Sequence, residues 1–272
     1  MAAGNVRDQV VAISGASSGL GLAAAQALAA QGCRVVGGGR RFPRDGLGFE
    51  TLALDVCDAG SAQGFVDQVL ARHGRLDALV NCAGLGMTGP LEATADDEER
   101  ALFEVNVLGM LRLCRAAIPH LRQRPGSRIV NVSSIAGTVA IPFHTAYCAS
   151  KFAVEGLSAS LQHELRPFGV HVSVIRPGDF LTESTERYAT VRGAGQAGAY
   201  RQAMQRAIEL MEADCRKGHD LSPFVRVLTQ ALSAPRPRGQ YVAAVRLQVL
   251  QAALARLAPA TLVSAVVARL YR

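Results

Sequence analysis

The sequence of 272 residues has no CxxC cysteine pair, no long uncharged apolar run and only two lysines. Its six cysteines are at least 24 residues apart, which favours reduced, buried thiols over a zinc site or a disulfide framework. No stretch of about 18 uncharged apolar residues occurs, so the sequence predicts no transmembrane helix. The first residues lack the charged and apolar regions of a secretion signal, and we therefore expect a cytoplasmic protein.

Acidic residues are missing from the last 52 positions, residues 221–272, which contain seven arginines. Residues 1–220 hold 22 basic and 22 acidic side chains, so the formal net charge of +7 comes entirely from the C-terminal segment. Such a segment is typical of a surface that binds nucleic acid or anionic lipid, or of a basic tail on a balanced enzyme. Because interleaved aromatic and lysine residues are missing, we expect no nucleic-acid partner.

Short β-branched runs alternate with longer helical patterns over much of the chain. Apolar residues make up 49% of the chain and charged residues 19%, which excludes a disordered, collagen-like or coiled-coil protein. The predicted strands are Val10–Ile13, Arg34–Val36, Thr51–Leu54, Ala78–Val80, Arg128–Val132 and His171–Ile175, and the predicted helices are Leu22–Gln31, Ser61–His73, Asp96–Arg122 and Tyr147–Arg166. This alternation predicts one doubly wound α/β domain over residues 1–272, with helices flanking a parallel sheet. After Arg41 the connection is short and contains Pro43, Gly46 and Gly48, so we expect a loop there.

A glycine-rich loop follows the first predicted strand. Gly15, Gly19 and Gly21 give the order G-x3-G-x-G before an alanine-rich helix. Without side chains, the backbone of such a loop can approach a diphosphate at the N-terminus of the helix. The alternative is a loop that needs glycine only for a left-handed turn. The position in a β-α-β unit favours a dinucleotide site made of Gly15, Ser17, Ser18, Gly19, Leu20 and Gly21.

The second predicted strand ends in three glycines followed by Arg40 and Arg41. A dinucleotide fold that prefers NAD carries a carboxylate near this point, which binds the ribose 2′-hydroxyl. A guanidinium pairs with a 2′-phosphate instead, and this favours NADP(H). The alternative is a pair of solvated surface arginines.

Tyr147 and Lys151 are four residues apart in a predicted helix, so their side chains share one face. A phenol exchanges protons poorly at neutral pH unless a neighbouring cation stabilises its phenolate. Lys151 is one of only two lysines among 29 basic residues, and its compact ammonium reaches several partners from one point. The pair predicts an acid–base function for Tyr147, and the alternative is a surface Tyr–Lys pair.

These motifs, together with several others in the same order, make the chain similar to the short-chain dehydrogenases/reductases from about Val10 to Thr182. The further motifs are Asp55-Val56, Asn81-Cys82-Ala83-Gly84, Asn106, Ser133-Ser134 and Pro177-Gly178-x3-Thr182. The resemblance implies a Rossmann fold, an NADP(H)-dependent enzyme acting on CH–OH groups, and a homodimer or homotetramer. It adds to the cofactor site Asp55, Val56, Asn81, Ala83, Gly84, Tyr147, Lys151, Pro177, Gly178, Phe180 and Thr182.

The same resemblance implies roles for two further polar side chains. Ser134, thirteen residues before Tyr147, would polarise the substrate carbonyl, and Ser133 is the rival for this role. Asn106 would support a water-linked proton path to Lys151, or it is simply a polar helix residue. The six histidines show no ligand spacing, so we expect no metal; His144 is interpreted as a core or pocket-edge residue.

Residues 179–221 are predicted to cover the substrate. They combine a glycine-containing loop, residues 192–198, with an apolar helical stripe formed by Tyr200, Ala203, Met204, Ala207, Ile208 and Met211. The alternative is a packed crossover helix.

Further candidate walls of the substrate pocket are Leu85, Met87, Val139, Ile141 and Phe143. The walls and the segment Tyr147–Gly156, which is similar to the 17β-hydroxysteroid and retinol dehydrogenase-like branch, imply an apolar steroid-, retinoid- or lipid-like substrate. The alternative function is a non-catalytic NADP(H)-binding regulatory protein.

The C-terminal segment has apolar residues at helical spacing. Leu247, Leu250, Leu254 and Leu257 predict one amphipathic helix, and after Pro259 a second is predicted by Leu262, Val263, Val266, Val267 and Leu270. We interpret residues 240–272 as a basic amphipathic extension. It would cap the substrate pocket, meet another subunit or make peripheral contact with a membrane.

Overall fold

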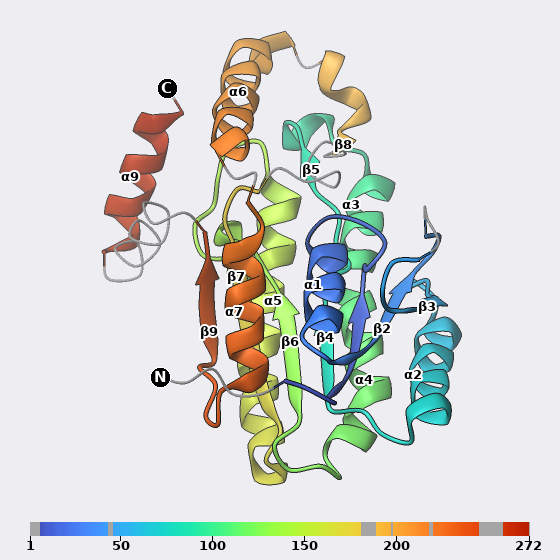
Figure 1. The fold of residues 1–272 in the computed structure, drawn as a ribbon. Helices are drawn as coiled ribbons and strands as arrows, with labels where there is room; N and C mark the ends of the chain where they lie inside the picture. Colours follow the sequence, from blue (N-terminus) through green and yellow to red (C-terminus); the bar gives the residue numbers. More distant parts are fainter. Residues whose placement is uncertain are drawn as a thin grey trace.

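A computed structural model describes residues 6–42, 46–180, 189–196, 198–217, 220–244 and 258–271. Seven parallel strands form one sheet in the order β3-β2-β1-β4-β6-β7-β9 (Figure 1). The strands are β1 Val10–Ser14, β2 Arg34–Gly39, β3 Glu50–Ala53, β4 Ala78–Asn81, β6 Arg128–Val132, β7 His171–Pro177 and β9 Gln240–Ala243. The order reverses between β1 and β4, and the parallel pairing confirms the doubly wound Rossmann fold.

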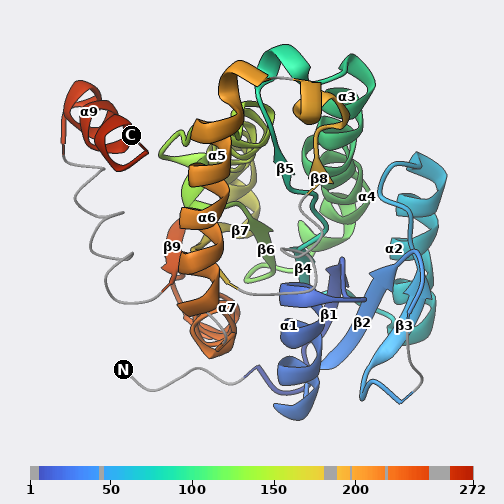
Figure 2. The ribbon, with the colours of Figure 1, turned by 90° about the horizontal axis from the view of Figure 1, so that it is seen from above.

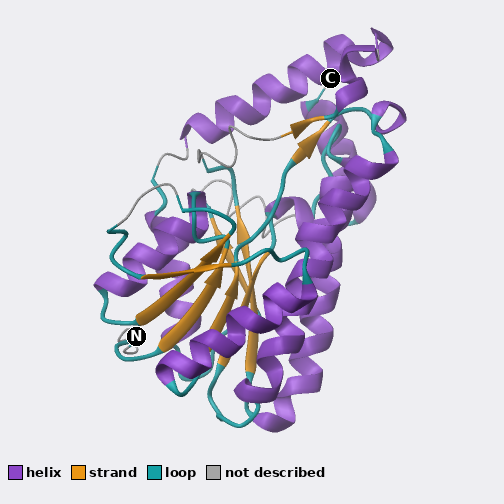
Figure 3. Ribbon diagram, turned by 90° about the vertical axis from the view of Figure 1, so that its right-hand side faces the viewer, coloured by secondary structure: helices purple, strands orange, loops and turns teal. Residues whose placement is uncertain are grey.

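Helices cover both faces of the sheet, as Figure 3 shows. Helices α1 Gly19–Ala30 and α7 Ser222–Ser233 pack on one face, where Leu28 and Phe224 are fully buried. The other face is covered by α2 Ala59–His73, α4 Met110–Leu121 and α5 Thr145–Leu165. The central strands β1 and β4 are therefore buried on both sides, which explains why their sequences are largely apolar instead of alternating, whereas the edge strand β3 is mostly exposed.

The predicted helix from Asp96 to Arg122 is divided by a π-helical turn. Helix α3 spans Asp96–Phe103, the π turn spans Glu104–Gly109, and α4 follows directly. Gly109 lies against the loop that follows β3, since a Cβ at this glycine would stand 2.8 Å from the side chain of Val56. Such turns often occur at functional sites, and this one contains Asn106.

The short connection between β2 and β3 contains no helix in its described residues, as the sequence predicts. Two aromatic rings partly cover the sheet instead. Phe42 and Phe49 pack edge to face with their centroids 6.5 Å apart. Gly37 of β2 makes this packing possible, because a Cβ at that position would stand 2.5 Å from the Phe49 ring. Pro43 lies outside the described residues.

Smaller elements lie at the carboxyl end of the sheet, around the segment predicted to cover the substrate. Strands β5 Met87–Thr88 and β8 Ala189–Thr190 pair in parallel, and helix α6 Arg201–Lys217 lies beyond them (Figure 2). The short 3₁₀ helices are Leu91–Ala93, Ile135–Gly137, Arg166–Phe168, Arg192–Gln196 and Gly198–Tyr200. No helix of the described chain is long and apolar enough to cross a membrane.

The C-terminal region corrects one predicted boundary. Residues 240–243, expected to open an amphipathic extension, form β9 instead, and Tyr241 packs into the core. Their backbone pairs with β7, and the preceding α7 was also not predicted from the sequence. Helix α9, Ala260–Leu270, confirms the second of the two helices predicted there. The first, over Leu247–Leu257, lies outside the described residues.

Candidate active site

A cleft of about 370 Å³ lies at the carboxyl ends of the strands, where the strand order reverses. Open α/β sheets bind their ligands at this place. The cleft is lined by many of the predicted residues: Gly15, Ser17, Ser18, Leu20, Gly21, Arg40, Asp55, Val56, Ala83, Gly84, Ser134, Tyr147, Lys151, Pro177, Gly178 and Phe180. Gly19, Arg41, Asn81 and Asn106 stand outside this lining, and Thr182 lies outside the described residues.

The glycine-rich loop is packed as tightly as the sequence pattern suggests. Gly15 has a left-handed φ of 70°, and a Cβ at Gly21 would stand 2.2 Å from the carbonyl oxygen of Gly15. Helix α1 therefore begins directly beside the cleft. Ser18, its N-cap residue, makes no side-chain cap bond. The exposed amide donors of this helix end, with the guanidinium of Arg40 at the rim, form a donor set that fits the phosphates of a dinucleotide.

Two polar side chains near the cleft hold strands together. The Ser14 hydroxyl accepts hydrogen bonds from the backbone N–H groups of Cys82 and Ala83, each at 3.2 Å. Serine thus provides the hydroxyl that joins the ends of β1 and β4. The amide of Asn81 donates to Asn131 Oδ1 at 2.8 Å, inside the sheet, which explains why Asn81 does not line the cleft.

Tyr147 and Lys151 lie on the cleft side of α5 and are both buried. Lys151 Nζ stands 5.8 Å from the centroid of the Tyr147 ring and donates to the Val132 carbonyl at 3.2 Å. Burial lowers the pKa of Lys151 to about 8, against the influence of Cys82 and Glu155, which raise it. The predicted pair is therefore in place, with a compact ammonium in a site of low polarity.

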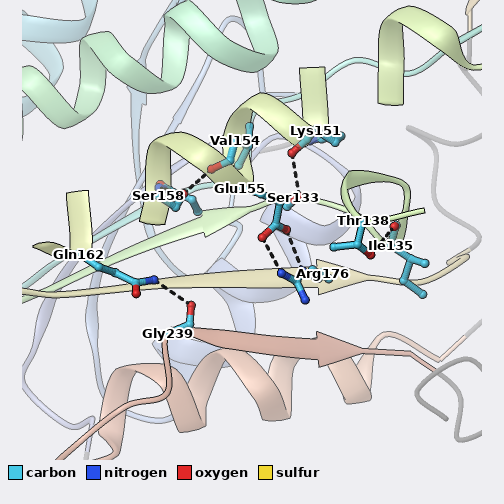
Figure 4. A network of polar contacts seen from close by, with 11 residues as sticks. Ser133, Ile135, Thr138, Lys151, Val154, Glu155, Ser158, Gln162, Arg176 and Gly239 are labelled. Carbon is cyan, nitrogen blue, oxygen red and sulfur yellow. Dashed lines mark hydrogen bonds and ion pairs between the residues drawn. The ribbon is translucent and has the colours of Figure 1, made fainter. Parts of the chain in front are cut away.

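Several contacts hold α5 in position against the sheet (Figure 4). Glu155, one turn beyond Lys151, accepts two hydrogen bonds from the Arg176 guanidinium of β7 at 2.8 and 2.7 Å. Gln162 donates to the Gly239 carbonyl beside β9 at 3.2 Å. A bidentate, mostly buried ion pair fixes both the position and the rotation of a helix. These contacts determine where Tyr147 and Lys151 point.

The depressed pKa of Lys151 predicts a pH dependence of stability. Below pH 8 the ammonium is buried at a cost in the folded state, whereas it is solvated in the unfolded state. Between pH 8 and about 10.5 the folded protein loses this proton first, so the cost disappears. We expect the free energy of unfolding of the wild type, relative to Lys151→Met, to rise by roughly 1–3 kcal/mol over this range. Urea denaturation at several pH values measures this difference, and a constant difference would contradict the assignment.

The two neighbouring serines have different environments. Ser133 is buried, and its hydroxyl donates to the backbone carbonyl of Lys151 at 3.3 Å. The hydroxyl of Ser134 accepts from the N–H of Ala136 at 3.1 Å, so its own proton is not used in that bond. Both serines line the cleft, but only Ser134 keeps its proton free to donate into it, and this favours Ser134 over Ser133.

Asn106 lies behind the cleft wall in the π turn. Its side chain accepts from the Leu85 N–H at 2.7 Å and donates to the Leu85 carbonyl and to the Ser150 hydroxyl at 2.9 and 3.0 Å. Gly84 lies between Asn106 and Lys151, since a Cβ there would stand 3.4 and 3.5 Å from their polar atoms. Asn106 thus joins the loop after β4 to α5. Its predicted proton-path role remains a prediction.

His144, the N-cap residue of α5, connects this helix to β5. Its Nδ1 donates to the Pro142 carbonyl at 2.9 Å, and its Nε2 accepts from the Thr88 hydroxyl of β5 at 2.9 Å. Burial lowers the pKa of this ring, which agrees with a neutral tautomer. The ring packs against Tyr147 with centroids 6.4 Å apart, as expected for a core histidine at the pocket edge.

The segment 189–200 packs over the end of the cleft. An apolar cluster joins Tyr147 and Met87 to Val191, Ala194 and Met204. Arg192 pairs with Asp97 of α3 at 2.5 Å, and the ring of Tyr200 packs on Phe143 with centroids 6.2 Å apart. Met211 of α6 also lines the cleft. That this segment covers the substrate stays a prediction, and its residues 181–188 lie outside the described ones.

Some lining residues were not included in the predicted site. Cys82, Val132 and Asp179 follow β4, end β6 and follow β7, at places where adjacent residues were predicted. Burial raises the pKa of the Cys82 thiol to about 12, while Lys151 acts to lower it. The position of Cys82 in Asn-Cys-Ala-Gly was a signal that could have identified it.

Comparisons with known proteins identify the family to which this chain is similar. The family model "short chain dehydrogenase" matches residues 9–192. The 3-ketodihydrosphingosine reductase of Bacteroides thetaiotaomicron is 36% identical over 214 residues, covering 78% of this chain and 79% of that protein. Human 17-beta-hydroxysteroid dehydrogenase type 1 is 39% identical over 194 residues, which cover 65% of this chain and 58% of that longer protein.

Solved structures share the architecture. A short-chain dehydrogenase from Streptomyces avermitilis superposes with a TM-score of 0.81 at 32% identity, covering 92% of this chain and 94% of that chain. A Burkholderia phymatum short-chain dehydrogenase/reductase in complex with NAD gives a TM-score of 0.74 at 25% identity, with 93% of both chains covered. The chain therefore belongs to the short-chain dehydrogenase family, whose members are oxidoreductases.

Proposed function

We propose that this protein is an NADP(H)-dependent oxidoreductase that interconverts an alcohol with a ketone or aldehyde on an apolar substrate, with Tyr147 as general acid and base. The observation that carries the proposal is the position of Tyr147. It lies beside the buried ammonium of Lys151 in a cleft at the carboxyl end of the sheet, and it belongs to the apolar cluster under the covering segment.

Each polar residue of the site has a distinct function in this proposal. In reduction, Tyr147 donates its phenolic proton to the carbonyl oxygen, and in oxidation it accepts the proton of the alcohol. Lys151 stabilises the phenolate through its positive charge. Ser134 donates a hydrogen bond to the substrate oxygen and polarises it. The nicotinamide, when bound, supplies or accepts the hydride.

The choice of NADP(H) over NAD(H) depends on Arg40 and its neighbour Arg41. Arg40 is exposed at the cleft rim after β2, where it can pair with a 2′-phosphate. A relative of known structure binds NAD, so the preference is a property of this chain's own residues. The double variant Arg40→Asp, Arg41→Ala should shift the ratio of kcat/KM for NADPH and NADH by about 10- to 100-fold toward NADH. Arg41→Ala alone serves as control, with a smaller shift because Arg41 does not line the cleft; an unchanged ratio in the double variant would contradict the assignment.

The apolar substrate class is supported by the walls of the site and by the relatives. Met87, Ile141 and Val191 belong to the apolar cluster around Tyr147. Two similar proteins are named for a ketosphingoid and a steroid, both of which are largely apolar molecules.

The family resemblance further implies a homodimer or homotetramer, with the cytoplasm as the expected location. Exposed Leu108 and Phe152 offer apolar surface for such an assembly.

A substrate panel tests the function directly. Purified protein is assayed with steroid, retinoid, long-chain and short polar carbonyls and alcohols, each with NADPH and NADH. We expect turnover of apolar carbonyls with NADPH. Tight NADPH binding without turnover of any compound would instead favour a regulatory NADP(H)-binding protein.

A further inference from the structure

Helix α9 exposes an apolar face. Leu262, Val266 and Leu270 are spaced by four residues and are 54%, 51% and 58% exposed. At this spacing the three side chains lie above one another on one side of the helix. Thr261, Ser264 and Ala268 lie on the side of the helix away from this face, and Val263 and Val267, which lie between the two, are partly buried. Large apolar side chains gathered on one exposed face mark a contact surface.

This helix stands on the β9 side of the molecule, away from β2 and β3, as Figures 1 and 2 both show. None of its residues belongs to the three apolar clusters of the described chain. Helix α6, which supplies Met211 to the cleft, stands on the same side. Helix α9 therefore lies on the same side of the molecule as α6, and away from the strands that precede Arg40 and Asp55.

The charge of α9 indicates what the face contacts. Arg269 is the one charged residue of this helix, and residues 221–272 of the sequence contain no acidic residue. On a helical wheel Arg269 borders Leu262, at the edge of the apolar face. A second copy of this helix would bring a like charge to the same edge. Phosphate groups of anionic lipids complement Arg269, and the acyl region accepts the apolar side chains.

We propose that α9 lies on the surface of an anionic membrane, with Leu262, Val266 and Leu270 in the interface and Arg269 among the headgroups. Eleven residues extend about 16 Å, roughly half the thickness of the hydrocarbon core, so the helix rests on the bilayer and does not cross it. The proposal is independent of the catalytic activity, because binding to lipid is measured without turnover.

Flotation with lipid vesicles tests this proposal on the full chain. Wild-type protein is mixed with phosphatidylcholine vesicles that contain or lack phosphatidylglycerol, at low and high salt. We expect binding to the phosphatidylglycerol vesicles that weakens with salt. In the triple variant Leu262→Ser, Val266→Ser, Leu270→Ser, binding to the phosphatidylglycerol vesicles should fall by at least about tenfold. The control Ala268→Ser places serine on the side of the same helix away from this face and should bind as the wild type does.

Circular dichroism and the melting temperature verify that the variants are folded. Arg269→Glu should weaken binding only to the phosphatidylglycerol vesicles. No wild-type binding, equal binding to both vesicle types, or unchanged binding of the folded triple variant would each overturn the proposal. A further outcome would also overturn it. If the wild type bound no lipid and the triple variant had a lower oligomeric mass in solution, the face would join two copies of this chain.

Discussion

Replacing Tyr147 with Phe is expected to lower kcat by about 10²- to 10⁴-fold, the usual contribution of a positioned acid–base group. Phenylalanine keeps the ring, its packing against His144 and its place in the apolar cluster with Met87 and Val191. Only the proton-transferring hydroxyl is removed. The affinity for NADPH, measured by fluorescence titration, should therefore stay within about twofold of the wild type, since the ring remains.

Tyr200→Phe is the matched control for this substitution. Its hydroxyl donates to Glu92 at 3.3 Å on the exposed outer side of the covering segment, and its ring packs on Phe143. Loss of such an exposed bond should change kcat by less than about threefold. If Tyr147→Phe kept more than a tenth of the wild-type kcat, another group would have to exchange the proton, and the role assigned to Tyr147 would be wrong.

The sequence predicted the main sheet because burial on both faces leaves a simple signature. Strands β1, β4 and β6 are short, largely apolar runs between helical patterns, and each ends near the cleft. Parallel topology then places the residues that follow these strands at one edge of the sheet. For this reason Gly15 could be placed at this edge from its position after β1, and the family resemblance added Ala83 and Ser134, although the three residues are far apart in the chain.

Other features depend on contacts that no local pattern records. Strand β9 has only four residues and is stabilised by pairing with β7, and β5 and β8 have two residues each. The direction of the Asn81 side chain follows from Asn131 on the neighbouring strand, which sequence order alone does not place beside it. Similarly, the choice between Ser133 and Ser134 required the position of the Lys151 carbonyl.

Lys151 gives the second large effect, and it distinguishes charge from shape. Lys151→Met removes the ammonium that stabilises the phenolate, and we expect kcat to fall by about 10²-fold or more. Lys151→Arg keeps the positive charge but should lose nearly as much activity. The buried ammonium donates to the Val132 carbonyl at 3.2 Å, and a longer, planar guanidinium cannot place a compact charge at the same point.

The comparison of the two variants is the informative measurement. Steady-state kcat, KM for NADPH and melting temperature are determined for both, with an added small primary amine as a rescue test on Lys151→Ala. If shape matters, Lys151→Arg stays inactive, whereas a small amine that fits the vacated space restores part of kcat in Lys151→Ala. An active Lys151→Arg would show that any nearby positive charge suffices. The chain uses arginine for 27 of its 29 basic residues, and the use of lysine at position 151 would then have no chemical reason.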